Sequence, residues 1–224
     1  MTERSKITYL ISGLGADYRT FNNLELSIGN IQHVPWHRPK YEQNLRRYAE
    51  ELIENHFDLS QEIQIIGLSF GGLVAQEIAH ILDLKDIILI SSMRTRAELP
   101  TKFKMLSKMP LYDSLMNPKK GLEIGIKNRK KQFHIETEDG MHLSKLILED
   151  TDPVFFKWAV KKIMNWNSPI PKNNFVQICG TKDPLFPFKK IINPTHVIEG
   201  GGHFMIYERA EEISKIINTT WDER

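Results

Sequence analysis

The sequence contains one cysteine, Cys179, which rules out an internal disulfide and suits a reducing compartment. This residue lies in the apolar stretch 175–179, so we expect a buried and unreactive thiol. Residues 1–6 lack the apolar core of a signal peptide, and no apolar run approaches the length of a membrane span. These absences predict a cytoplasmic protein with no membrane span.

The formal net charge is only +2, which argues neither for nor against a charged partner. Between residues 93 and 135, however, eleven Lys or Arg side chains stand against three Asp or Glu. This basic segment is either the solvated face of a helix or a positive field that attracts an anionic substrate or an acidic carrier protein. Nucleic-acid binding is not expected, because the segment lacks aromatic residues interleaved with its charges.

Metal-ligand spacings and a complete cofactor fingerprint are also missing. In the dinucleotide-binding pattern G-x-G-x-x-G, Gly13 and Gly15 occupy the first two positions, but Tyr18 stands where the third glycine is required. No metal and no cofactor is therefore predicted. Because the two glycines follow an apolar stretch directly, their loop either is a structural turn or presents backbone N–H groups to an anion.

The chain length of 224 residues fits one compact domain. Short apolar or β-branched runs predict strands at residues 6–11, 31–36, 63–66, 86–91, 175–180 and 195–198. Apolar residues at helical spacing predict helices over 44–57, after residue 69 and over 205–219. This alternation predicts an α/β fold with a mostly parallel central sheet and helices on both faces.

The alternation stops between residues 93 and 168, where no convincing buried strand occurs. A helix start is expected at Asp152, because Pro153 would then occupy the first helical turn, where proline is tolerated. We therefore predict an inserted, mostly helical lid over residues 93–168, between two parts of one core at residues 1–92 and 169–224.

The stretch from Gly67 to Gly71 has the spacing Gly-x-Ser-x-Gly, with Ser69 at its centre, an apolar run before it and a helical pattern after it. This is the sequence context of a nucleophile elbow, a tight turn from strand to helix that exposes a serine. Glycine on either side relieves crowding, because it has no Cβ. An ordinary tight turn is the alternative.

Two further polar residues, Asp183 and His203, each follow a predicted strand, as Ser69 does. The carboxyl ends of parallel strands meet at one edge of a sheet, so these side chains can converge there. A serine needs a base, a histidine supplies one near neutral pH, and a carboxylate orients that histidine. The order serine, acid, histidine also matches a known arrangement of this triad. Asp152 and Glu199 are the alternatives to Asp183.

Together with the stretch 12–15 (Ser-Gly-Leu-Gly), these motifs resemble the α/β-hydrolase superfamily over most of the chain outside residues 93–168. The resemblance implies that Ser69 is the nucleophile, Asp183 the acid and His203 the base. It further implies that the backbone N–H groups of Leu14 and Phe70 form the oxyanion hole. Many members have His-Gly where this chain has Ser-Gly, but a backbone donor needs no particular side chain. A sheet without the usual leading strands is also expected.

The predicted function is therefore a serine hydrolase that cleaves a small-molecule carboxylic ester or thioester through an acyl-enzyme. If the basic segment acts on the substrate, that substrate is anionic or bound to a carrier. The alternative is a ligand-binding or scaffold protein that keeps the fold without catalysis. Amide cleavage, carbon–carbon bond hydrolysis and perhydrolysis share the triad, so the sequence does not choose among these reactions, and it does not specify the oligomeric state.

Overall fold

The structure is a computed structural model that describes residues 5–106, 118–167 and 175–222. Its centre is a six-stranded sheet in the order β2-β1-β3-β4-β5-β6, and every neighbouring pair is parallel. The strands are β1 (Lys6–Ile11), β2 (Asn30–His33), β3 (Glu62–Leu68), β4 (Ile87–Ile90), β5 (Val176–Gly180) and β6 (His196–Ile198). The predicted parallel sheet is confirmed, and β2 ends two residues before Pro35, at the edge of the sheet.

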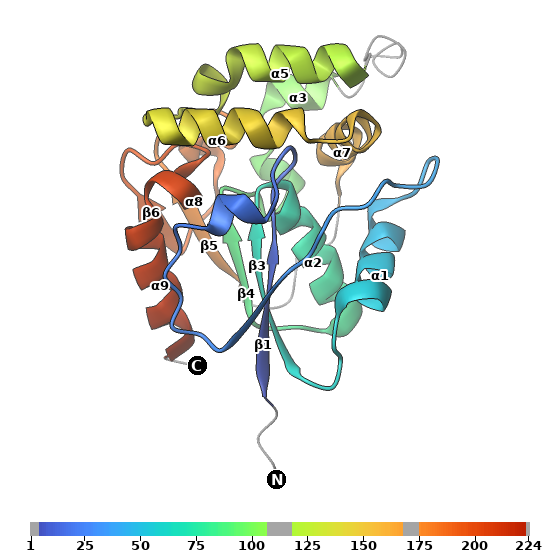
Figure 1. Ribbon diagram of the computed structural model, residues 1–224, viewed down its shortest axis with the longest axis vertical. Helices are drawn as coiled ribbons and strands as arrows, with labels where there is room; N and C mark the ends of the chain where they lie inside the picture. Colours follow the sequence, from blue (N-terminus) through green and yellow to red (C-terminus); the bar gives the residue numbers. More distant parts are fainter. Residues whose placement is uncertain (1–4, 107–117, 168–174, 223–224) are drawn as a thin grey trace.

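Helices cover both faces of this sheet (Figure 1). Helices α1 (Leu45–His56) and α2 (Phe70–Leu82) lie on one face, and α8 (Met205–Glu208) and α9 (Ala210–Asp222) on the other. Successive strand residues point to opposite faces, so Ile65 packs with α1 and α2 while Ile66 packs with α9. Each such buried side chain stabilises the fold by roughly 1.5–3 kcal/mol. This two-sided burial explains why β1, β3, β4 and β5 are mainly apolar, whereas the edge strand β2 is exposed and mainly polar.

The carboxyl-terminal helix differs from the expectation of one helix over residues 205–219. Arg209 leaves the helical conformation (φ −122°, ψ 33°) and separates α8 from α9. Just before this break, the Glu208 carboxylate accepts hydrogen bonds from the backbone N–H groups of Glu136 and Thr137 (2.9 and 2.7 Å). The donors of these bonds are far from Glu208 in the sequence, so the spacing of apolar residues along the helix could not predict the break.

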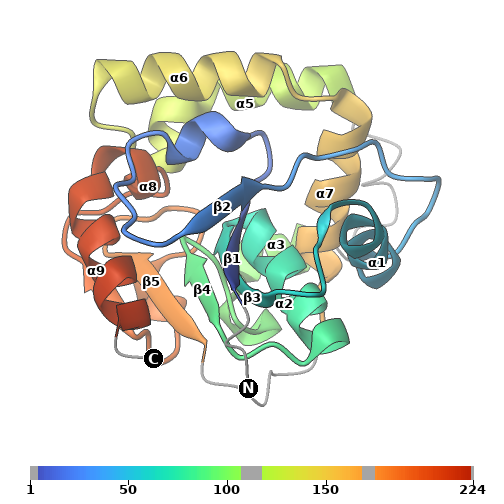
Figure 2. The same ribbon diagram turned by 60° about the horizontal axis from the view of Figure 1, so that its bottom comes forward.

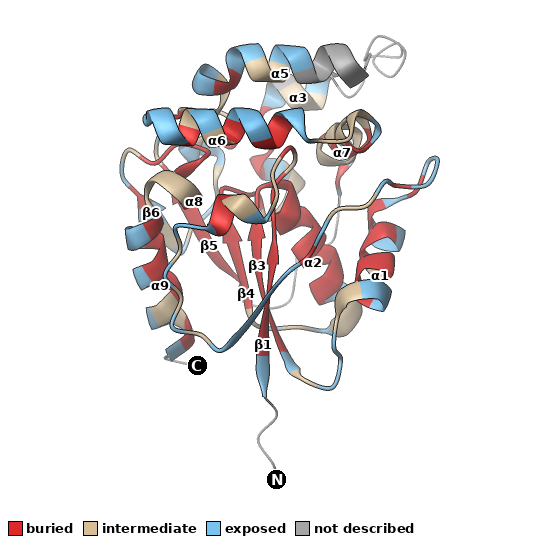
Figure 3. Cartoon of the chain, viewed as in Figure 1, coloured by how far each residue is buried: buried red, intermediate tan, exposed pale blue. Residues whose placement is uncertain are grey.

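The helices between β4 and β5 lie over the carboxyl ends of the strands (Figures 1 and 2). In the described part of this stretch they are α3 (Thr101–Leu106), α5 (Pro118–Phe133), α6 (Glu138–Glu149) and α7 (Pro153–Asn165). Asp152 caps α7 by accepting hydrogen bonds from two backbone N–H groups, and Pro153 is its first residue, as predicted. Figure 3 shows that the central strands β3, β4 and β5 are buried, whereas α5 and α6 expose their outer faces.

Three short 3-10 helices complete the described structure: η1 (Tyr18–Phe21), η2 (Arg96–Glu98) and η3 (Phe188–Lys190). In the three described ranges, no helix combines the length and the apolar character needed to cross a bilayer. Cys179, in β5, is 2% exposed, and burial raises the pKa of its thiol to about 11. The predicted buried cysteine is therefore confirmed.

Candidate active site

Ser69 lies in the single-residue bend between β3 and α2. Its backbone has φ 51° and ψ −116°, a conformation that costs energy for any residue with a Cβ. Two hydrogen bonds to its backbone hold the bend in place: Ser69 N donates to Ile90 O (2.9 Å), and Ser69 O accepts from the Ser92 hydroxyl Oγ (2.7 Å). The surrounding structure thus enforces the strain that the elbow motif predicts.

The two glycines of the motif are required by close backbone contacts. A Cβ on Gly71 would lie 2.2 Å from Ile11 O and 2.3 Å from Ser12 O, at the end of β1. A Cβ on Gly67 would lie 2.6 Å from the Cα of Gly72. Real Cβ atoms do not approach other atoms this closely, so β1, β3 and α2 can meet around the serine only because these positions carry no side chain.

The structure brings Ser69, His203 and Asp183 together into one hydrogen-bonded chain. Ser69 Oγ lies 2.9 Å from His203 Nε2, and His203 Nδ1 lies 2.8 Å from Asp183 Oδ2. The residues are 9%, 3% and 4% exposed, respectively. An ionised carboxylate only accepts hydrogen bonds, so Nδ1 carries the proton and Nε2 is left to accept from the serine hydroxyl. This is the tautomer that a general base needs.

The carboxylate and the imidazole are each held by further contacts. Asp183 Oδ1 accepts from the backbone N–H groups of Leu185 and Phe186 (2.8 and 2.9 Å), so the free oxygen, Oδ2, faces the histidine. His203 N donates to Phe133 O (2.8 Å), and the imidazole contacts the Phe133 ring edge-on at 5.0 Å. Both groups are therefore fixed in orientation before any ligand arrives.

The alternative acids, Asp152 and Glu199, are engaged elsewhere. Asp152 caps α7 and forms an ion pair with Arg38, and Glu199 accepts a hydrogen bond from Thr181 (3.1 Å). Only Asp183 of the three candidates contacts His203 among the described residues.

The two residues expected to supply the oxyanion hole, Leu14 and Phe70, belong to segments that adjoin the serine. A Cβ on Gly13 would lie 3.2 Å from Ser69 Cβ, so the loop after β1 packs directly against the elbow, and Leu14 lines the same cavity as Ser69. Phe70 is the first residue of α2. The first N–H groups of a helix have no partner within it, and the helix dipole makes that end attractive to negative charge.

A cavity of about 170 Å³ opens over Ser69 and His203. Its polar lining consists of Ser69, His203, Arg129 and Gln132. The rest is mainly apolar, with side chains from the loops and from the helices between β4 and β5, including Leu14, Leu99, Leu148, Phe156, Val160 and Phe186. The cavity thus places an apolar environment next to the serine and the histidine.

A second, larger cavity of about 430 Å³ is lined by other residues of the loop after β1, including Ser12 and Gly15. None of the three hydrogen-bonded residues lines it. Its charged side chains include Arg38 and Asp152, which pair with each other. The smaller cavity is therefore the one that adjoins Ser69 and His203.

Sequence reasoning did not single out Arg129 and Phe133, two residues of α5 at this cavity. Arg129 was one of eleven basic residues between residues 93 and 135, and nothing in the charge pattern distinguished it. One signal was present: Gly125, Arg129 and Phe133 are four residues apart, which places them on one face of a helix. All three line the cavity.

Among the described residues, no cluster of three or more His, Cys, Asp or Glu side chains could hold a metal ion.

No model of a known protein family matches the chain, and no curated protein matches it. Solved structures do match. A thermophilic esterase from Thermogutta terrifontis with bound malate has a TM-score of 0.66 at 16% identity, over 99% of this chain and 91% of that one. A meta-cleavage product hydrolase from Pseudomonas fluorescens IP01 has a TM-score of 0.66 at 16% identity, over 99% and 92% of the two chains.

A lipase-esterase related protein from Clostridium acetobutylicum ATCC 824 has a TM-score of 0.65 at 16% identity, over 96% of this chain and 94% of that one. These similarities extend over nearly the whole chain. They show that it has the α/β-hydrolase fold, which the sequence resemblance predicted.

Proposed function

We propose that this protein is a serine hydrolase that cleaves a carboxylic ester or thioester through an acyl-enzyme. The observation that carries the proposal is the continuous hydrogen-bonded chain from Ser69 through His203 to Asp183, whose first two members line a cavity. The strained backbone of Ser69 supports it as well, because such strain is concentrated at functional sites. The esterase and hydrolase structures that share the fold make the same class of reaction a natural starting point.

In the proposed reaction, Ser69 Oγ attacks the carbonyl carbon while His203 Nε2 accepts the serine proton. The negative charge that forms on the carbonyl oxygen is stabilised by the N–H groups of Phe70 and Leu14. The tetrahedral intermediate collapses, and the departing alcohol or thiol takes the proton from His203. A water molecule, deprotonated by the same nitrogen, then attacks the acyl carbon; the bond to Ser69 Oγ breaks, the acid leaves, and His203 returns the proton to the serine oxygen. Asp183 stabilises the imidazolium in both half-reactions.

We further propose that residues 93–168 act as a lid that selects the substrate. The support is positional: α3, α5, α6 and α7 lie over the carboxyl ends of the strands, and side chains from these helices form much of the cavity wall (Figure 1). Enclosure by apolar side chains excludes water from the serine, which strengthens the electrostatic interactions of the reaction.

The test is labelling with a fluorophosphonate, which reacts with activated serines, followed by turnover of p-nitrophenyl esters of increasing chain length. The wild-type protein should label and hydrolyse short esters, and Ser69→Ala and His203→Ala should do neither. Ser27→Ala and His80→Ala are matched controls, because both residues are exposed and lie outside the cavity. Labelling that persists in Ser69→Ala would contradict the assignment. A folded wild type that neither labels nor hydrolyses any ester would favour a non-catalytic binding protein.

A further inference from the structure

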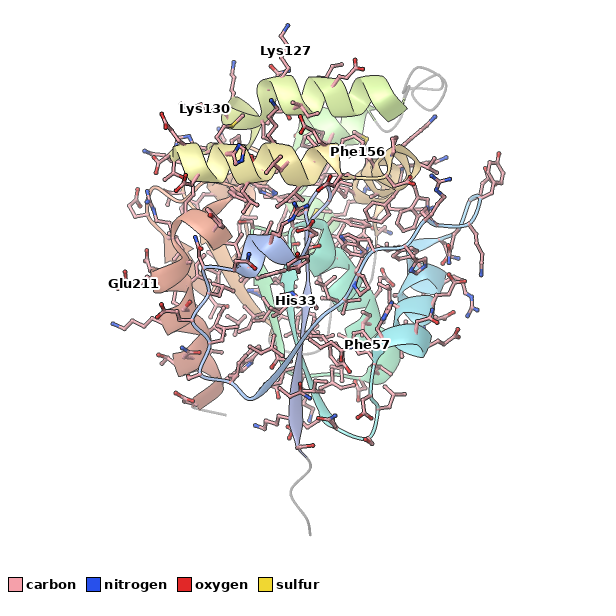
Figure 4. The ribbon with its side chains drawn as sticks, in the orientation of Figure 1. His33, Phe57, Lys127, Lys130, Phe156 and Glu211 are labelled. Carbon is pink, nitrogen blue, oxygen red and sulfur yellow. The ribbon has the colours of Figure 1, made fainter. Side chains whose placement is uncertain are left out.

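Arg129 is a buried cation that pairs with no carboxylate among the residues that the structure describes. Arg129 is only 3% exposed. On the same helix, α5, the nearby Lys127 and Lys130 are exposed and project away from the sheet (Figure 4). Arg129 Nη2 donates to Gly15 O (3.2 Å), and Arg129 Nε has no hydrogen-bond partner. Burial lowers the pKa of this guanidinium to about 9, so it stays protonated at neutral pH.

Such an arrangement costs stability. A buried charge is normally paired, and an unpaired one carries a desolvation penalty that hydrogen bonds to neutral groups only partly offset. A site that retains an unpaired cation therefore suggests that the missing partner is a ligand.

The position of Arg129 connects it to the proposed reaction centre. The side chain lines the same cavity as Ser69 and His203. Its guanidinium carbon lies 3.8 Å from the centre of the Phe133 ring, and that ring lies 5.0 Å from the centre of the His203 imidazole. Its hydrogen-bond acceptor, Gly15, belongs to the loop that also packs against the serine. The Phe133 ring therefore contacts both the Arg129 guanidinium and the imidazole of the proposed base, His203.

We propose that Arg129 binds a carboxylate on the acyl part of the substrate, so that the substrate is a monoester or monothioester of a short dicarboxylic acid. This inference rests on the proposed function, and it specifies the substrate class of the same site. The apolar walls between Arg129 and Ser69 would contact the methylene groups that join the two carboxyl carbons.

The charge and the volume of the cavity favour a small monoanion. Arg129 is the one cation that lines the cavity among the described residues, apart from His203 when protonated, so it matches a single negative charge. A volume of about 170 Å³ admits a short acyl chain and excludes a long fatty acyl group unless the helices move. The exposed lysines of α5 would act at longer range, by attracting the anion towards the site.

The test separates binding from catalysis. In the Ser69→Ala background the ester remains intact, so its affinity can be measured by calorimetry. The ligands are the monomethyl esters of succinic, glutaric and adipic acid, each compared with the analogue that carries a carboxamide in place of the free carboxylate. We expect one length to bind roughly 10- to 100-fold more tightly as the carboxylate. The double variant Ser69→Ala/Arg129→Met should lose this preference, and Ser69→Ala/Arg129→Lys should retain part of it.

Thermal unfolding distinguishes a binding role from a structural one. If Arg129 serves the ligand, Arg129→Met removes an unpaired buried charge and should leave the melting temperature unchanged or raise it. A lower melting temperature, with equal weakening of the carboxylate and the carboxamide, would show that the arginine only holds the loop at Gly15. Equal affinity for the carboxylate and the carboxamide at every length would also overturn the assignment.

Failure of the carboxylate site and failure of the proposed hydrolase activity give different results. Arg129-dependent binding by a protein whose wild type does not label with fluorophosphonate would support the carboxylate site and contradict the hydrolase. Labelling without any carboxylate preference would support the hydrolase and contradict the carboxylate site.

Discussion

The strain at Ser69 can be measured by comparing Ser69→Gly with Ser69→Ala. The backbone of this residue (φ 51°, ψ −116°) is favourable only for glycine, and such a conformation costs other residues about 1–3 kcal/mol. Glycine loses roughly 0.5–1 kcal/mol more than alanine in conformational entropy when the chain folds. We therefore expect Ser69→Gly to be more stable than Ser69→Ala by about 1 kcal/mol.

The comparison isolates the backbone, because both variants lack the hydroxyl that contacts His203. The bonds that enforce the bend, from Ser69 N to Ile90 O and from Ser92 Oγ to Ser69 O, involve atoms that both variants keep. Thermal unfolding followed by circular dichroism should place the melting temperature of Ser69→Gly about 2–4 °C above that of Ser69→Ala for a chain of this size. Urea unfolding provides the free energies.

An equal or lower melting temperature for Ser69→Gly would refute this reasoning, because it would mean that the bend stores no strain. The expected result would mean that the fold loses stability in order to hold the serine oxygen near the histidine. That would be independent support for a functional elbow, since an ordinary turn gains nothing from a strained serine.

Three other predictions concern the elbow, the acid and the pH dependence of stability. Gly71→Ala should lower the free energy of unfolding, measured in urea, by about 3 kcal/mol, because the new Cβ would lie 2.2 Å from a backbone oxygen. The control Gly29→Ala should change this free energy by less than about 0.5 kcal/mol, because no atom lies within 4 Å of its new Cβ. Equal effects would contradict the packing argument. Asp183→Asn should lower kcat for an ester at least about 100-fold while the protein stays folded, because an amide N–H facing Nδ1 selects the wrong imidazole tautomer; activity above a tenth of wild type would contradict this role. A hydrogen bond from Lys40 is the largest cause that lowers the pKa of Glu51 from 4.5 to about 2. The folded pKa is the lower one, so this stabilisation is complete above about pH 4.5 and is lost as the pH falls towards 2. Urea unfolding at pH 5 and pH 3 should therefore show a smaller loss for Glu51→Gln than for wild type, and identical losses would refute the assignment.

Much of the fold was predictable because its signals are local. The span of β1 matches the expected strand, and α1 and α2 lie where apolar spacing placed them. A strand that is buried on both faces needs apolar residues in sequence, and a helix needs them on one face, so the pattern is written in neighbouring residues. The bend at Ser69 is local as well, since glycines two residues away relieve its crowding.

The tertiary structure alone decided the contacts between distant residues. The sequence offered Asp152, Asp183 and Glu199 as acids, and only the path of the loop after β5 turns Asp183 towards His203. The break at Arg209 likewise accompanies hydrogen bonds from a distant segment to Glu208.

Arg129 shows most clearly which features follow from the local sequence and which depend on tertiary packing. By itself the sequence determined a parallel α/β sheet with a serine at an elbow, and a basic segment between two core strands, because periodicity, backbone sterics and composition act over a few residues. Only packing decided that one of eleven basic side chains is removed from water, at a cavity shared with Ser69 and His203, while Lys127 and Lys130 remain exposed. Desolvation depends on everything that surrounds a group, so the charge that gives this site its proposed specificity becomes visible only in the folded chain.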